Sequence, residues 1–148
     1  MDIKKTYGTD KEKEKSGVWE DLGDGARVLV ARIGNPNYRR IFEQLTKPYQ
    51  KAIRRGTLSE EKATDLIIKS LAKAVLLNWE GLKEDGKLLK YSEKEAIRLM
   101  TDYPDFRDQV QEIANDLETY RISEDEETEK NSGKSSAVPK SRGQAGVV

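Results

Sequence analysis

The chain has 148 residues, of which 36% are charged and 35% hydrophobic, and its 27 basic and 27 acidic side chains leave no net charge. This balance argues against bulk electrostatic binding to nucleic acid or to an anionic membrane. Cysteine and histidine are both absent, which excludes disulfides, thiolate nucleophiles and zinc sites with sulfur or imidazole ligands.

The length allows one domain. No apolar run approaches the roughly 18 residues that a membrane span requires, and the charged N-terminus lacks the apolar region of a signal peptide. We therefore expect a cytoplasmic protein that does not contact a membrane.

Residues 1–16 are dominated by the alternating charges of Lys11-Glu12-Lys13-Glu14-Lys15. A helix formed here would have no apolar face to bury, so we predict a flexible charged leader.

Residues 17–33 predict a β-hairpin, because Gly23-Asp24-Gly25 separates two runs of strand-forming residues. Val28 and Val30 share one face of the returning strand, and Leu29 and Ala31 share the other. Both faces are apolar, so we expect one to pack on helices and the other to meet another subunit or a partner.

A helix is predicted to begin after Gly34, with Asn35 as its N-cap and Pro36 in its first position. Pro48 should kink or divide this helix, and Gly56 should end it. Its basic side chains suit either a nucleic-acid contact or a solvated helix face, and the zero net charge favours the latter. These basic residues are Arg39, Arg40, Lys51, Arg54 and Arg55.

The most hydrophobic stretch follows Ser59, a predicted N-cap. We predict a long helix from Glu60 that Trp79 closes and Gly81 stops, with a broad apolar face that at least two other elements must cover. A charged stripe at three- and four-residue steps, from Lys62 to Lys73, marks its solvent side.

Asp85-Gly86 predicts a turn, followed by a short extended piece. Ser92 and Glu95 form a capping box for a helix that ends at Met100. Tyr103-Pro104 breaks the chain before a last helix, residues 105–121. The polar residues 123–148, acidic at their start, predict a disordered tail.

The sequence contains no recognisable reaction centre. Gly23-Asp24-Gly25 lacks the spacing of a phosphate-binding loop, and neighbouring carboxylates such as Glu84 and Asp85 are typical of turns and caps. The acidic run 124–127 lacks the pattern of an EF-hand loop. We therefore expect no catalytic residue, no cofactor, no metal site and no enzymatic activity.

An ordered set of short segments resembles the tail assembly chaperones of long-tailed, siphovirus-like bacteriophages. The resemblance extends over residues 17–120, and the set is more specific than any one of its members. The segments are Gly17-Val18-Trp19, residues 31–38, residues 75–82, Glu84-Asp85-Gly86, residues 89–92 and residues 103–107.

Membership of that family implies a non-catalytic role. Such proteins coat and solubilise the tape measure protein during tail assembly, help to recruit the tail tube protein, and are lost from the finished virion. Many occur in two lengths through ribosomal frameshifting, and this chain, with its polar tail, would correspond to the shorter product. We also expect self-association, a location in the host cell cytoplasm and no binding of nucleic acid.

These inferences give an α+β, mostly α fold: one N-terminal β-hairpin packed on about four helices in a single domain, residues 17–122, between a flexible leader and a disordered tail. Two other functions stay open, namely a nucleic-acid-binding regulator that uses the basic helix and a structural tail or neck protein of the virion. The residues expected to face a client or a second subunit are Trp19, Val28, Val30, Trp79 and Leu82.

Overall fold

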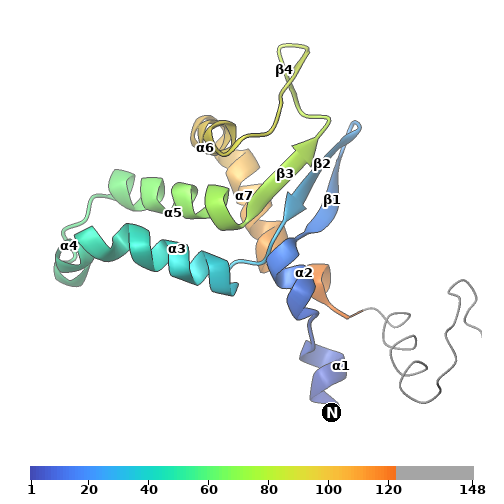
Figure 1. Ribbon diagram of the computed structural model, residues 1–148, viewed down its shortest axis with the longest axis horizontal. Helices are drawn as coiled ribbons and strands as arrows, with labels where there is room; N and C mark the ends of the chain where they lie inside the picture. The colour runs from blue at the N-terminus through green and yellow to red at the C-terminus, as the bar shows by residue number, and fades with distance from the viewer. Residues whose placement is uncertain (123–148) are drawn as a thin grey trace, which may run out of the picture. The chain divides into compact units, whose positions relative to one another are not determined.

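The computed structural model describes residues 1–122 (Figure 1), so the predicted tail at 123–148 lies outside the described residues. The fold is α+β and mostly helical, as the sequence predicts. Residues 11–120 form the larger of two compact units, and residues 1–10 and 121–122 belong to the other.

Among the described residues of the smaller unit, Ile3–Tyr7 form one short helix, α1. Asp2 caps this helix by accepting hydrogen bonds from the backbone N–H groups of Lys4 and Lys5. Thr9 forms an isolated antiparallel bridge with Arg121, so the two chain segments of this unit contact each other.

The larger unit begins with a second short helix, α2 (Lys11–Ser16). Arg32 anchors this helix through a guanidinium contact of 2.7 Å to the Glu14 carboxylate and a backbone hydrogen bond of 2.9 Å to the Glu14 carbonyl. The prediction of a flexible leader is therefore wrong. The contacts between Arg32 and Glu14 hold α2 in place, although this helix has no apolar face to bury.

The predicted hairpin is confirmed as β1 (Val18–Gly23) and β2 (Ala26–Val30). Asp24 and Gly25 in the turn both have positive φ angles, 54° and 77°, which suits the tight turn of an antiparallel hairpin. A third strand, β3 (Leu76–Glu80), extends the sheet in the antiparallel order β1-β2-β3.

Strand β3 replaces the end of the predicted long helix. The helix α5 (Glu60–Ala74) begins at the Ser59 cap as expected but ends 5 residues before Trp79, which instead pairs with Val28 of β2. The run from Val75 to Trp79 is almost continuously apolar, and such a run suits a buried strand as well as a buried helix. Pairing with β2, which is distant in sequence, decides between them.

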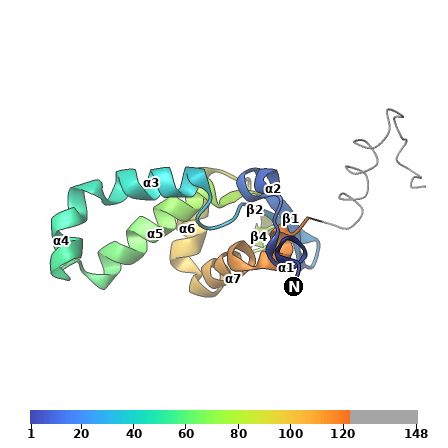
Figure 2. The same ribbon diagram turned by 90° about the horizontal axis from the view of Figure 1, so that it is seen from below.

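The helix that Asn35 was expected to cap is α3 (Pro36–Thr46), and Asn35 accepts hydrogen bonds from the N–H groups of Asn37 and Tyr38. Pro48 lies in a 3₁₀ turn, η1 (Lys47–Tyr49), that divides α3 from α4 (Gln50–Arg55). Helices α3 and α5 lie side by side, and α4 joins them at the end away from the sheet (Figures 1 and 2).

After β3 the chain forms a small hairpin, β4 (Lys83–Glu84) and β5 (Lys87–Leu88), around the predicted turn. Helix α6 (Glu93–Asp102) starts at the Ser92 cap and continues two residues beyond the predicted end. The last predicted helix is shorter than expected, because α7 (Pro104–Asn115) ends where Asp116 becomes extended. A 3₁₀ turn, η2 (Leu117–Tyr120), follows it.

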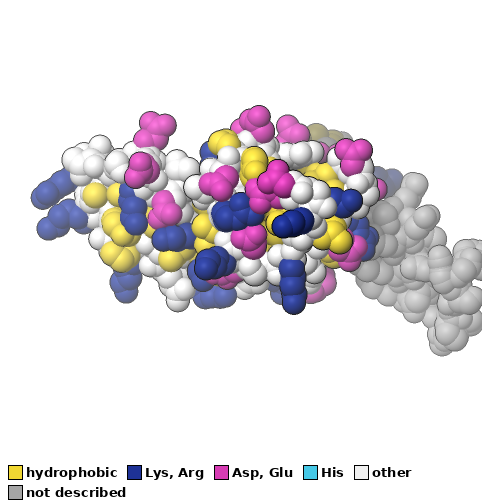
Figure 3. Space-filling model, turned by 90° about the horizontal axis from the view of Figure 1, so that it is seen from above, with side chains coloured by type: hydrophobic (Ala, Val, Ile, Leu, Met, Phe, Trp, Pro, Cys, Tyr) yellow, Lys and Arg dark blue, Asp and Glu magenta, His cyan; other side chains and the backbone are white. Residues whose placement is uncertain are grey.

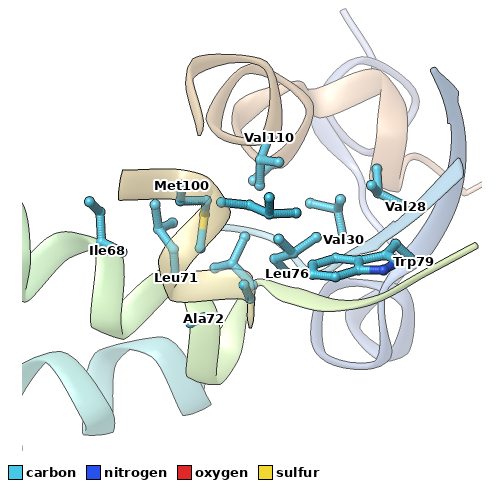
Figure 4. Packing of buried hydrophobic residues seen from close by; sticks show 13 residues of the cluster. Val28, Val30, Ile68, Leu71, Ala72, Leu76, Trp79, Met100 and Val110 are labelled. Atoms are coloured by element: carbon cyan, nitrogen blue, oxygen red, sulfur yellow. The ribbon is translucent and has the colours of Figure 1, made fainter. Parts of the chain in front are cut away.

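The core lies between the sheet and helices α5, α6 and α7 (Figure 4). Leu71 and Met100 from the helices and Val28 and Val30 from the sheet are all fully buried. The broad apolar face of α5 is therefore covered by several elements, as its width predicts. No helix within residues 1–122 is long and apolar enough to cross a membrane.

Candidate interaction groove

Three of the five residues expected to face a partner are core residues. Val28 and Val30 are 0% exposed and Trp79 is 4% exposed, and all three belong to the buried cluster of Figure 4. A partner could reach them only if the core opened. Their burial corrects the expectation that they form a binding surface, because the alternation along β2 directs its valines toward the helices.

Trp19 is separate from these residues. It pairs with Leu29 on the opposite strand, is half-buried, and lies beneath the Arg27 guanidinium at 4.2 Å from its ring centroid. Arg27 in turn donates a 2.8 Å hydrogen bond to Glu80 of β3. The indole is thus covered in part by a charged side chain of its own sheet.

Leu82, the fifth residue, lines a groove of about 580 Å³ between the β4–β5 hairpin and helices α6 and α7. We call this the client groove. The apolar residues that line it are Leu82, Leu89, Leu99 and Phe106. The polar ones are Lys83, Glu84, Asp85, Tyr103, Asp105 and Gln109. On the face that carries β4, Figure 3 shows patches of apolar surface among charged side chains.

Hydrogen bonds from core residues position the segment after the small hairpin, which forms one wall of the groove. The Trp79 indole N–H donates to the Leu89 carbonyl at 2.8 Å, and the Leu89 N–H donates to the Leu82 carbonyl at 2.8 Å. Tyr91 packs edge-on against Trp79, with ring centroids 4.9 Å apart, and donates to the Leu76 carbonyl. Trp79 therefore shapes the groove from inside the core.

A charged network ties the hairpin to α6. Arg98 donates to both carboxylate oxygens of Glu84, at 2.8 and 3.3 Å, and to both of Glu95, at 2.9 and 3.0 Å. The Tyr103 hydroxyl donates to Glu84 at 2.5 Å. The Arg98 hydrogen bonds, and then that of Tyr103, lower the pKa of Glu84, while the bond to Glu84 raises the pKa of Tyr103.

This arrangement suits binding by shape and apolar contact. Arg98 and Tyr103 occupy the oxygens of Glu84 and lower its pKa, which makes this carboxylate a weak general base. The groove is lined by apolar side chains and by polar ones, a composition that can accept the apolar face of an amphipathic helix.

The sequence interpretation missed Tyr103, Phe106 and Leu89 as groove residues. Tyr103 is 46% exposed, and its exposure depends on how α6 and α7 meet. One local signal was present: Leu88-Leu89 follows a tight turn without the alternation of a half-buried strand. The two leucines divide accordingly, with Leu88 exposed and Leu89 partly buried against the core.

A family model described as YdaY prophage protein matches residues 33–131, which is more than half of the chain. The whole client groove lies inside the matched region, whereas the β1–β2 hairpin precedes it. The match supports a bacteriophage origin, and its description does not mention tail assembly. No curated protein and no solved structure matches the chain.

Proposed function

We propose that this chain, which belongs to the YdaY prophage protein family and whose sequence resembles tail assembly chaperones, serves the assembly of a phage particle as such a chaperone. In this role it binds a helical segment of the tape measure protein in the client groove, keeps that protein soluble and helps to recruit the tail tube protein. It acts by binding, without catalysis, in the cytoplasm of the host cell, and is absent from the finished virion.

One observation carries this proposal. Four of the segments that resemble tail assembly chaperones lie between residue 75 and residue 107, and they contribute most of the groove lining: Leu82, Glu84, Asp85, Leu89, Tyr103, Asp105 and Phe106. The same segments include core positions such as Val75, Leu76 and Trp79, and a resemblance that reflected only the fold would be confined to such positions. Residues brought together at a surface groove instead support a shared ligand.

The first test is co-expression with the tape measure protein encoded in the same prophage, followed by pull-down and a solubility assay. We expect a soluble complex that contains several copies of this chain for each tape measure protein. A tape measure protein that stays insoluble and does not co-purify would contradict the proposal. Detection of the chain in purified particles by mass spectrometry would favour the structural tail or neck protein.

A groove variant makes the test specific. Tyr103→Ala removes an exposed aromatic group from the groove, and we expect it to weaken binding roughly tenfold or more, as truncation of a tyrosine hot spot does. Tyr7→Ala is the matched control, because Tyr7 is 58% exposed and does not line the groove. Equal affinity of the two variants, both with the thermal stability of the parent, would remove the groove from the proposal.

A further inference from the structure

The zero net charge of the chain conceals a strong separation of charge along it. Residues 36–58 contain six basic side chains and one acidic side chain, Glu43, whereas residues 101–116 contain five acidic side chains and one basic side chain, Arg107. Both segments belong to the unit of residues 11–120. In Figure 3, Lys and Arg side chains project at the left end, where α4 lies in Figure 1, and Asp and Glu side chains follow the upper edge.

The basic end consists of Lys51, Arg54 and Arg55 on α4. All three are exposed, and within residues 1–122 no carboxylate lies close enough to form an ion pair with any of them. Like charges four residues apart, as in Lys51 and Arg55, destabilise an isolated helix. The nearest acidic residues along the chain, Glu60 and Glu61, begin the next helix.

The acidic face consists of Asp105, Asp108 and Glu112 on α7. Their spacing of three and four residues places them on one side of the helix, opposite the buried Val110 and Ala114. All three are exposed and without an ion pair in the part of the chain that the structure describes. The one cation of this helix, Arg107, donates instead to the Met100 carbonyl.

Helix dipoles explain only part of this pattern. They favour Asp105 in the first turn of α7 and Arg54 and Arg55 in the last turn of α4. They do not explain Asp108, Glu112 or Lys51, which lie away from the favourable ends. The basic end also lies far from α7 in both Figure 1 and Figure 2, so the two surfaces do not meet within one chain.

We propose that the basic end of one copy docks on the acidic face of a second copy. The two surfaces are complementary in charge, each lacks a counterion within residues 1–122 of its own chain, and both are built on helices of the same unit. Because the contact joins two different surfaces, a pair of copies still presents one free basic end and one free acidic face, so the assembly continues into a ring or an open helical array. Of the residues in this contact only Asp105 also lines the client groove, and the variants that test the contact leave Asp105 unchanged.

The contact is weak and sensitive to salt. Exposed ion pairs are individually weak, because water screens them and ordering two long side chains costs entropy, and ionic strength near 1 M reduces the screening length to about 3 Å. The wild-type chain should therefore associate at high protein concentration in about 50 mM salt and become monomeric in about 1 M salt. Sedimentation velocity without any client protein measures this directly.

A charge exchange tests the pairing of the two surfaces. The doubly substituted chain Arg54→Glu with Arg55→Glu carries acid on both surfaces, and Asp108→Lys with Glu112→Lys carries base on both. Each should be monomeric alone, and an equimolar mixture should associate at least as well as the wild type, because each acidic surface then meets a basic one. If these residues had only a structural role, mixing the two variants would not restore association.

Lys90→Glu with Lys94→Glu is the matched control. It changes the net charge by the same amount as the α4 variant, at two exposed positions outside both surfaces, and should leave association unchanged. A wild-type chain that is monomeric in low salt, or a mixture that stays monomeric, would overturn the proposal. If the wild type is monomeric and shifts duplex DNA in a gel through Arg54 and Arg55, the basic end binds nucleic acid instead.

Discussion

Gly81 ends strand β3 at a point where two parts of the backbone nearly touch. Its φ angle is 76°, and a Cβ atom there would lie 2.2 Å from the carbonyl oxygen of Gly25 in the β1–β2 turn. Gly81→Ala therefore adds a steric clash to the cost of a left-handed backbone, which is about 1–2 kcal/mol for an L-residue. We expect the free energy of unfolding to fall by more than that amount, as measured by urea denaturation.

Gly86→Ala is the control for Gly81→Ala. The φ angle of Gly86, 79°, is nearly the same, but nothing lies within 4 Å of the position that a Cβ would occupy. Gly86→Ala should therefore show the backbone cost alone. Equal losses of stability in the two variants would mean that the contact between Gly81 and Gly25 relaxes without cost.

Single residues with local chemistry were predictable from the sequence. Asn35, Ser59 and Ser92 each cap the helix that they were expected to cap, because a cap needs only a side-chain oxygen next to the first free N–H groups. The position and hydrogen bond of Trp79 were not predictable from local sequence in the same way. Its indole N–H finds its acceptor, the Leu89 carbonyl, only after β3 and the small hairpin are in place.

At the scale of elements, the difference between local and distant contacts explains which predicted elements were right and which were wrong. The β1–β2 hairpin is specified by its own turn, so its sequence sufficed. Strand β3 depends on β2, and the client groove depends on how the β4–β5 hairpin meets α6 and α7. Helix α2 depends on Arg32, which lies on the far side of the hairpin in sequence. Contacts of this range leave no local pattern.

The network between the small hairpin and α6 predicts a loss of stability in acid. Hydrogen bonds from Arg98 lower the pKa of both Glu84 and Glu95 below the ordinary value of 4.5. A carboxylate with a lowered pKa stabilises the folded state above 4.5, and this contribution is lost as the pH falls through its folded pKa. The urea midpoint of the wild type should therefore fall between pH 6 and pH 3.

Arg98→Met isolates this effect. Without the guanidinium, the two carboxylates lose their common donor, so the variant should be less stable than the wild type at pH 6 and should lose less stability on acidification. An NMR titration of the Glu84 carboxyl carbon checks the premise directly. A midpoint at or above 4.5 in the wild type, or parallel acid limbs for the two chains, would contradict it.

At the scale of the whole unit, one buried cluster joins the sheet to α5, α6 and α7, so residues 11–120 should unfold in a single transition. Leu71 is 0% exposed, and Leu71→Ala should lower the free energy of unfolding by about 2–5 kcal/mol. Leu88→Ala is the control, because Leu88 is 70% exposed and its truncation should change stability by less than about 0.5 kcal/mol.

The two tryptophans make the cooperativity measurable. With Trp19→Phe as the parent, fluorescence reports Trp79 alone, which lies in the core, while circular dichroism reports the helices. Leu71→Ala should shift both denaturation curves by the same amount, because the sheet and the helices share one core. If the Trp79 signal is lost before the helical signal, the sheet separates from the helices, and the client groove, whose hairpin follows β3, would be lost with it.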